Sequence, residues 1–254
     1  MISVAIITFN EEKNIERCLK SLCFGPSGWE TLIDEIVILD SGSTDRTESL
    51  AKSFPKVRWE VQVPFLGHIQ QKQMAAEIAK NDWILSLDAD EALTETLQQS
   101  ILQASLHRQN AFLWNRLNHF GNQPIRHGRW YPDAKVRLWN RNDGKWGGIN
   151  PHDKVVLTAG VQVHQLQGDL LHFTCRDETH FKTTMRHYAA LGNRARTDLG
   201  KKNHPWKGWL GGLFHFVADY FFRLGFLDGK PGWIIAREQF WYTVRKYRNS
   251  INQK

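Results

Sequence analysis

Cysteine is scarce in this chain of 254 residues, which contains only Cys18, Cys23 and Cys175. Because the number is odd and no Cys-x-x-Cys pair occurs, the sequence argues against a disulfide framework and against a zinc site. Unpaired cysteines in turn favour a reducing compartment. The chain also lacks a basic segment before its first apolar run, so residues 2–9 are expected to form a strand and not a signal peptide.

Two common nucleotide-binding motifs are absent as well. The chain contains neither Gly-x-x-x-x-Gly-Lys-Ser/Thr nor Gly-x-Gly-x-x-Gly, which argues against the phosphate-loop and dinucleotide-binding classes. Long apolar runs are also missing. The apolar stretch within residues 206–227 is too short to span a membrane, and His215 and Asp219 interrupt it.

Excess basic charge is missing from most of the chain. Residues 1–200 hold 23 basic and 23 acidic residues, whereas residues 201–254 hold 10 basic and 3 acidic ones, so the net charge of +7 lies in the C-terminal segment. A nucleic-acid-binding module would carry its basic residues on the folded domain. We therefore expect no nucleic-acid partner.

What the chain does contain is an acidic cluster directly after a short apolar run. Residues 83–87 are typical of a buried strand, and Asp88, Asp90 and Glu91 follow it. Because residues two apart on an extended segment point the same way, Asp88 and Asp90 can converge on one target. Paired carboxylates suit a hard divalent cation, which itself suits a diphosphate. Taken alone, the pattern also fits a solvated acidic turn before a helix that begins near Thr94.

The first hundred residues alternate between strand and helix patterns, which predicts a parallel sheet with strands at residues 2–9, 35–40, 57–63 and 83–87. Polar clusters follow three of these strands, at residues 8–11, 40–45 and 88–91. The carboxyl ends of parallel strands share one edge of the sheet, and ligands bind there. Three clusters at that edge predict a binding site.

These clusters, Thr8-Phe-Asn-Glu11, Asp40-Ser-Gly-Ser-Thr-Asp45 and Asp88-Ala-Asp-Glu91, resemble in order and spacing the motifs of family 2 inverting glycosyltransferases. The resemblance extends over residues 1–175. It implies an α/β fold of the GT-A type, Rossmann-like, with a mostly parallel central sheet flanked by helices. It also implies a UDP-sugar donor, bound by Thr8, Glu11, Asp40, Ser43, Lys72 and Asp88. For Lys72, an ordinary surface lysine on a helix is the alternative.

A metal site follows from the same resemblance. In that family the Asp-x-Asp motif holds a divalent metal against the diphosphate, so Asp90, with Asp88 close by, would bind Mg²⁺ or Mn²⁺. His172 follows a short apolar run and would complete the site. A lone histidine is more often structural than a metal ligand, and this alternative stays open.

Residues 119–133 form a long segment rich in glycine, arginine, histidine and aromatic residues, which suits contact with a polar acceptor. We expect its acceptor-binding residues to be Arg126, His127, Arg129, Trp130 and Asp133. The alternative is a surface loop anchored by its aromatic side chains.

The resemblance assigns the catalytic base to Asp153, after Trp146-Gly-Gly148. Relatives usually carry His-Glu where this chain has His152-Asp153, so the reach of the shorter side chain is the point in question. Asp133 is the main competitor for this role. Asp143 lies in an Asn-Asp-Gly sequence that predicts an exposed turn.

Residues 125–133, 172–174 and 225–229 narrow the resemblance to bacterial lipopolysaccharide inner-core β-glucosyltransferases. This implies UDP-glucose as donor and an inner-core heptose as acceptor. A peptide, a protein or another polysaccharide remains an alternative acceptor. Two other classes fit less well. A phosphatase usually carries Asp-x-Asp on its first strand, and a nucleotidyltransferase has a basic, glycine-rich loop after that strand.

The C-terminal segment predicts helices with an apolar side. The expected domains are residues 1–175, with a donor half (1–105) and an acceptor half (106–175), and a helical appendage at 176–254. Within residues 206–227, aromatic and aliphatic residues recur at helical spacing beside lysine and arginine. Such a helix can lie on an anionic membrane surface, which predicts a cytoplasmic protein peripheral to the inner face of the bacterial inner membrane. The alternative is that these helices pack on the catalytic domain.

Overall fold

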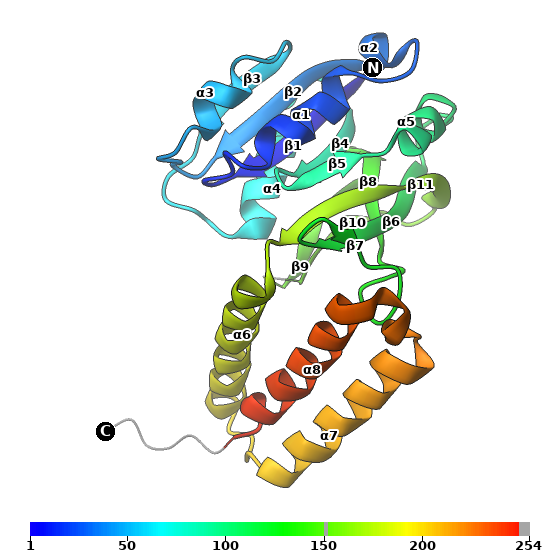
Figure 1. The fold of residues 1–254 in the computed structure, drawn as a ribbon. Coiled ribbons are helices and arrows are strands. Elements are labelled where there is room, and N and C mark those ends of the chain that lie inside the picture. The colour runs from blue at the N-terminus through cyan, green and yellow to red at the C-terminus, as the bar shows by residue number, and fades with distance from the viewer. Residues whose placement is uncertain (150–151, 249–254) are drawn as a thin grey trace. The chain divides into compact units, whose positions relative to one another are not determined.

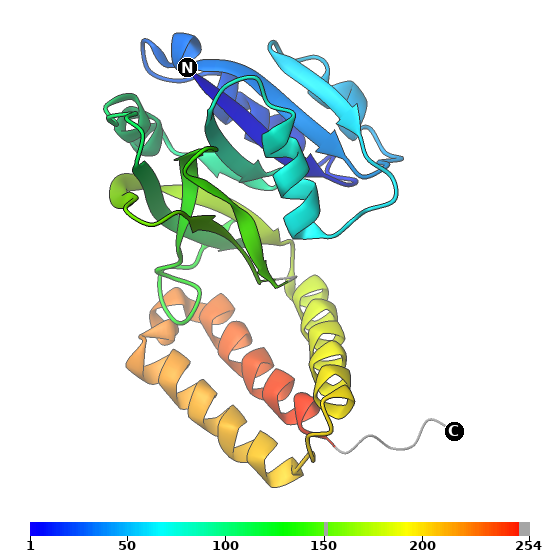
Figure 2. The same cartoon turned by 180° about the vertical axis from the view of Figure 1, so that it is seen from behind.

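The computed structural model describes residues 1–149 and 152–248 (Figures 1 and 2). The chain divides into two compact units. The first unit contains Met1–Arg116 and Asp133–His172, and the second contains Leu117–Pro132 and the chain from Phe173 onward. Most of the expected acceptor loop thus belongs to the second unit. Residues 249–254 of the expected appendage lie outside the described residues.

The first unit begins with the alternation that the sequence predicts. Its elements in this part are β1 (Ile2–Thr8), α1 (Ile15–Cys23), α2 (Trp29–Leu32), β2 (Ile33–Asp40), α3 (Thr47–Ala51), β3 (Val57–Val61), α4 (His68–Glu77), β4 (Trp83–Asp88), β5 (Glu91–Leu93) and α5 (Glu95–Leu102). Helix α5 begins where expected, because the Thr94 hydroxyl accepts a hydrogen bond from the Leu97 N–H. The remaining strands are β6 (Asn110–Phe120), β8 (Ala134–Asn140), β9 (Gly144–Ile149), β10 (His152–Leu157) and β11 (Gln162–Cys175).

One mixed sheet organises the first unit, with the strand order β3-β2-β1-β4-β8-β6-β11-β5. Strands β3, β2, β1 and β4 run parallel, whereas β8 is antiparallel to both β4 and β6. Strands β9 and β10 form a separate antiparallel pair. The predicted α/β class with a central sheet flanked by helices is confirmed, but the expectation of a mostly parallel sheet is wrong, because β5, β6, β8 and β11 pair antiparallel. The parallel part is the half expected to bind the nucleotide.

Both faces of β1, β4 and most of β2 are buried, which explains their nearly continuous apolar sequences, whereas the edge strand β3 is largely exposed. On β1, Ile2, Val4 and Ile6 pack into a core that includes α1. Ala5 points the other way, into a second core that includes residues of α4. Helices α1 and α3 accordingly lie on one face of the sheet and α4 on the other (Figures 1 and 2).

The register of these strands brings the predicted polar clusters together. Thr8 at the end of β1 pairs with Asp40 at the end of β2, and Ile7 pairs with Asp88 at the end of β4. The expectation that three polar strand ends meet at one edge is therefore correct.

The second unit consists mainly of helices, which run side by side in Figure 1. Its elements are β7 (Gln123–Pro124), α6 (Glu178–Asp198), α7 (Pro205–Val217), the π-helical turn η1 (Ala218–Phe222), the 3₁₀ turn η2 (Gly225–Asp228) and α8 (Gly229–Lys246). Its small core contains Phe120, Ile125, Phe181, Ile234 and Ile235 among other residues. No described helix is long and apolar enough to cross a bilayer.

The prediction of one helical stripe over residues 206–227 is wrong beyond Phe222. Helix α7 ends at Val217 and continues directly into the π-helical turn η1, which ends at Phe222, and the 3₁₀ turn η2 follows. Gly225 comes so close to η1 that a Cβ there would lie 2.6 Å from the Asp219 carbonyl oxygen. This close approach turns the chain back before α8 and is not visible in the local apolar spacing.

Candidate active site

The loops after β1 and β2 are tied to each other by hydrogen bonds. The Asn10 N–H donates to the Ser43 hydroxyl at 2.8 Å, and the Glu11 N–H donates to the Thr47 hydroxyl at 2.8 Å. Asp40 holds its own loop, because one carboxylate oxygen accepts from the N–H groups of Gly42 and Ser43 at 2.8 and 2.7 Å. The two predicted nucleoside-binding segments therefore form one pre-organised surface.

Two of the predicted nucleoside residues, Thr8 and Glu11, differ in their hydrogen-bond partners. The Thr8 hydroxyl oxygen is buried and has no hydrogen-bond partner among the described residues. A buried polar atom without a partner is costly, and a bound nucleoside would satisfy it. Glu11 accepts a hydrogen bond from the Asn14 side chain at 2.8 Å, which orients its carboxylate.

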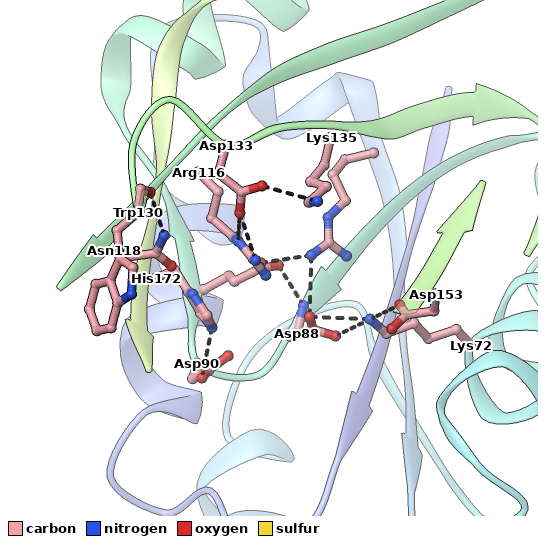
Figure 3. A network of polar contacts seen from close by, with 12 residues as sticks. Lys72, Asp88, Asp90, Arg116, Asn118, Trp130, Asp133, Lys135, Asp153 and His172 are labelled. Atoms are coloured by element: carbon pink, nitrogen blue, oxygen red, sulfur yellow. Dashed lines mark hydrogen bonds and ion pairs between the residues drawn. The ribbon is translucent and has the colours of Figure 1, made fainter. Parts of the chain in front are cut away.

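Lys72 is buried on α4, so the alternative of a surface lysine is wrong. Its ammonium lies 2.9 Å from one carboxylate oxygen of Asp88 and 2.8 Å from a carboxylate oxygen of Asp153 (Figure 3). It also sits 4.8 Å from the centre of the Trp146 ring. A single cation thus connects the end of β4 with the predicted base on β10.

Arg137 on β8 supplies a second buried cation. It donates to Asp88 at 3.2 Å and to Glu91 at 2.8 Å. Burial opposes ionisation of Asp88, but Lys72 and Arg137 outweigh it and hold the pKa of Asp88 well below its usual range. Burial raises the pKa of Glu91, and Arg137 counters this only in part. Two nitrogens of Arg137, Nε and Nη1, are buried without a partner among the described residues.

Asp90 and His172 form a separate pair, with Asp90 Oδ2 and His172 Nε2 3.2 Å apart (Figure 3). The expected grouping of Asp88 with these two is not found. Both oxygens of Asp88 contact Lys72, and no three His, Cys, Asp or Glu side chains in the described part of the chain are arranged to hold a metal. One carboxylate with one neighbouring donor still fits a divalent ion that takes its remaining ligands from phosphates and water.

Asp133 is held by two cations of its own. Arg116 contacts it at 2.7 Å and Lys135 at 3.0 Å. Burial opposes ionisation of Asp133, yet these cations prevail and lower its pKa. Asp143, expected in an exposed turn, is instead buried and accepts from Arg108 at 2.7 Å. Asp133 is therefore held by two cations and Asp143 by one, whereas the ion pair of Asp153 in the described part of the chain is with Lys72.

The expected acceptor residues of the second unit have partners within that unit. His127 lies 3.0 Å from Asp228, and Arg129 is paired with the buried Asp219. The Trp130 ring packs edge-on against Phe181, with ring centres 5.5 Å apart. Arg126 is exposed, and its backbone N–H donates to Asp228 at 3.1 Å. The aromatic anchoring considered as an alternative is thus present.

Sequence reasoning missed Arg137 and Glu91 as parts of this network. Glu91 was grouped with the acidic cluster, but it is buried and accepts a hydrogen bond from the Asp88 N–H at 2.8 Å. The available signal was the arginine between Val136 and Leu138, since a charged residue within an apolar strand is rarely buried without an acidic partner.

The structure thus combines polar ends on the parallel strands β1, β2 and β4 with an Asp90–His172 pair whose histidine lies on the antiparallel strand β11. The sequence profile of Glycosyl transferase family 2 matches residues 3–161. The chain therefore belongs to that family and is a glycosyltransferase, as predicted.

Relatives of known sequence agree with this assignment. An uncharacterized glycosyltransferase of Rickettsia bellii is 30% identical over 245 residues, covering 92% of this chain and 80% of its own. Lipopolysaccharide core biosynthesis glycosyltransferase LpsC of Rhizobium meliloti is 28% identical over 239 residues, covering 90% of this chain and 82% of its own.

Solved structures support the same fold. The structure of S. aureus TarS 1-349 in complex with UDP-GlcNAc superimposes with a TM-score of 0.51 at 18% identity, covering 96% of this chain and 81% of that chain. At this identity the match concerns the GT-A fold alone.

Proposed function

We propose that this glycosyltransferase transfers a hexose from a UDP-sugar to a heptose of a lipopolysaccharide inner core. Among UDP-sugars, we propose that it prefers UDP-glucose. The acceptor class is supported by the similarity to LpsC over most of both chains. The donor class is supported by the pre-organised loops after β1 and β2 and by the buried, unsatisfied hydroxyl of Thr8. Glu11, Asp40, Ser43 and Asp88 would complete the nucleotide-sugar site.

The reaction we propose is a direct displacement with inversion. The acceptor oxygen attacks the anomeric carbon while the bond from that carbon to the diphosphate breaks. Asp153 takes the proton from the acceptor hydroxyl, as general base. The single observation that carries this role is the contact between Asp153 and Lys72 at 2.8 Å, because it places a carboxylate beside a cation that also contacts Asp88.

We further propose that Asp90 and His172 hold Mg²⁺ or Mn²⁺, with Asp88 nearby on the nucleotide. Such an ion would offset the charge that develops on the departing diphosphate. Lys72 and Arg137 would add fixed positive charge close to the same region, and both are buried where charge interactions are strong.

We also propose peripheral attachment to the inner face of the bacterial inner membrane. Helix α7 packs against α8 through glycine, since a Cβ on Gly212 would lie 2.9 Å from the Phe240 ring. Its large apolar side chains are instead exposed: Trp206, Trp209, Leu210, Leu213 and Phe214. Lys201, Lys202 and Lys207 lie beside them, so the surface combines aromatic residues with positive charge.

One experiment tests the donor and the metal together. UDP release from a panel of UDP-sugars is measured with Mn²⁺, with Mg²⁺ and with EDTA. We expect UDP-glucose to be hydrolysed fastest and EDTA to suppress the reaction. In the same conditions UDP should raise the thermal midpoint more with metal than with EDTA, and Asp90→Ala should abolish that difference. Equal stabilisation by UDP in EDTA would reject the metal, and a different preferred sugar would reject UDP-glucose.

A further inference from the structure

The segment Gly225–Asp228, which forms η2, has no part in the chemistry described above. Within the second unit, however, Asp228 is buried and faces the acceptor loop. Its Oδ1 accepts from the Arg126 N–H at 3.1 Å and lies 3.0 Å from His127 Nδ1, and its Oδ2 accepts from the His127 N–H at 2.9 Å. The Gln123 side chain donates to its backbone carbonyl at 2.8 Å.

The neighbouring turn η1 holds the next part of the same loop. Asp219 is buried and pairs with Arg129, whose guanidinium also contacts His215 at 3.2 Å. The Gly128 N–H donates to the Arg223 carbonyl oxygen at 2.9 Å. Two short turns therefore fasten residues 123–129 by hydrogen bonds and ion pairs.

Glycine makes this arrangement possible at two positions. A Cβ on Gly225 would lie 2.6 Å from the Asp219 carbonyl oxygen, and a Cβ on Gly232 would lie 1.9 Å from the Gly225 carbonyl oxygen. Real Cβ atoms do not approach backbone oxygens so closely. The glycines at both positions thus allow η1, η2 and the start of α8 to pack closely together.

We propose that Asp228 is a positioning residue that sets the backbone of the acceptor loop, so that the loop meets a phosphate- or hydroxyl-rich glycolipid acceptor in one conformation. This proposal rests on the proposed function, because the contact between loop and acceptor is itself proposed. A purely stabilising role explains the site poorly. Buried charged contacts often contribute no more to stability than apolar packing of the same volume, whereas they do fix a geometry.

The test compares Asp228→Asn with Asp198→Asn, a matched control at an exposed acid on α6. In Asp228→Asn one carboxylate oxygen becomes an NH₂ group, which faces a backbone or ring N–H and cannot accept from it. We measure hydrolysis of UDP-glucose without acceptor, KM and kcat for lipopolysaccharide truncated after its inner-core heptoses, and trypsin cleavage after Arg126 and Arg129.

We expect Asp228→Asn to raise KM for the truncated lipopolysaccharide about 10-fold to 100-fold, since hydrogen bonds to a charged group are lost. Donor hydrolysis should stay within about 2-fold of wild type, and trypsin should cut the loop faster. Asp228→Glu should bring KM part of the way back to the wild-type value. Asp198→Asn should leave KM, donor hydrolysis and the cleavage rate unchanged. If Asp228→Asn does not fold, Gln123→Met removes only the hydrogen bond from the Gln123 side chain to the Asp228 carbonyl oxygen. This variant should raise KM and the cleavage rate in the same way, but less.

Faster cleavage with an unchanged KM would overturn the proposal, because the loop would be released without affecting the acceptor. An unchanged cleavage rate would overturn it too. If wild-type protein hydrolyses the donor but does not glycosylate this lipopolysaccharide, the proposed acceptor fails, and trypsin cleavage then decides whether Asp228 holds the loop.

Discussion

The two units of this molecule place their apolar and charged residues in opposite ways. In the first unit α1 turns Ile15, Leu19 and Leu22 into the core, and strands β1 and β4 are covered on both faces. In the second unit α7 turns glycine toward its neighbour and leaves Leu210 60% and Phe214 69% exposed. Helix α1 thus buries its apolar side, whereas α7 presents a contiguous apolar side that water solvates poorly.

The buried acids differ in the same manner. Asp88 in the first unit is held by Lys72 and Arg137, so two buried cations lie near the predicted diphosphate site. The carboxylate oxygens of Asp228 in the second unit contact the backbone N–H and the ring of His127. The buried cations around Asp88 in the first unit suit electrostatic stabilisation of a substrate. The buried carboxylate of Asp228 in the second unit instead orders the backbone of the acceptor loop.

The largest expected effect concerns the chemistry of the first unit. Asp153→Asn removes the proposed base but keeps its size and a hydrogen-bonding oxygen for Lys72. General base catalysis contributes about 10²-fold to 10⁴-fold, so transfer should fall by that factor. The affinity for the UDP-sugar, measured by calorimetry, should hardly change, because the residue is proposed to face the acceptor. Turnover close to wild type would show that another group takes the proton.

A second prediction concerns the exposed surface of the second unit. The double variant Leu210→Ser with Phe214→Ser should weaken binding to vesicles of phosphatidylglycerol and phosphatidylethanolamine by about 10²-fold or more, since each buried side chain contributes about 1.5–3 kcal/mol. Co-sedimentation measures the effect. Donor hydrolysis in the first unit should be unaffected.

The matched control for this variant is Val61→Ser, which removes an exposed apolar side chain from β3 of the first unit. It should leave vesicle binding unchanged. High salt should release wild-type protein, because each basic residue near the anionic surface contributes about 1 kcal/mol. Wild-type protein that stays in the supernatant at low salt would contradict the membrane proposal altogether.

The parts of the site that the sequence predicts are those set by local rules. Apolar runs ending in acids place Thr8, Asp40 and Asp88 at one edge, because the register of parallel strands follows from their period and length. The start of α5 at Thr94 follows from its capping residue in the same way. Both predictions needed only a few neighbouring residues.

The parts that the sequence does not predict depend on contacts between distant residues. Lys72 lies on a helix of weak apolar pattern, and its partner Asp153 is 81 residues away. Arg137 and Asp88 are 49 residues apart. Gly212 of α7 packs against Phe240 of α8, which follows 28 residues later. The sequence neighbours of a lysine, an arginine or a glycine do not indicate whether tertiary packing will bury that residue.

A third prediction tests why α7 exposes its apolar side chains. Gly212→Ala should lower the free energy of unfolding by about 1–3 kcal/mol, because the new methyl group would collide with Phe240. Its neighbour Gly211→Ala is the control, since a Cβ there would lie 3.4 Å from the Thr243 methyl carbon, an ordinary contact. That change should be neutral or stabilising by up to about 1 kcal/mol. Urea unfolding of both variants decides, and equal midpoints would mean that α7 does not pack closely through Gly212.

The smallest expected effect concerns Asp133, the competitor of Asp153. Arg116 and Lys135 hold Asp133 in its ionised form, and its pKa is lowered in the folded state. A depressed pKa contributes stability above the unfolded value of about 3.9, and this contribution is lost as the pH falls through the folded value. Asp133→Asn should therefore cost about 1 kcal/mol at pH 7 and progressively less below about pH 4.

Activity gives the decisive comparison for the same variant. Asp133 is held by two cations that lower its pKa, whereas Asp153 is paired with Lys72 in the described part of the chain. We therefore expect Asp133→Asn to keep turnover within about 3-fold of wild type, far from the loss of 10²-fold or more expected for a missing base. Acceptor transfer by Asp133→Asn and Asp153→Asn is measured side by side at pH 7. If Asp133→Asn loses turnover while Asp153→Asn retains it, the roles are exchanged. The ion pairs of Asp133 with Arg116 and Lys135 would then have to open before Asp133 accepts the proton of the acceptor.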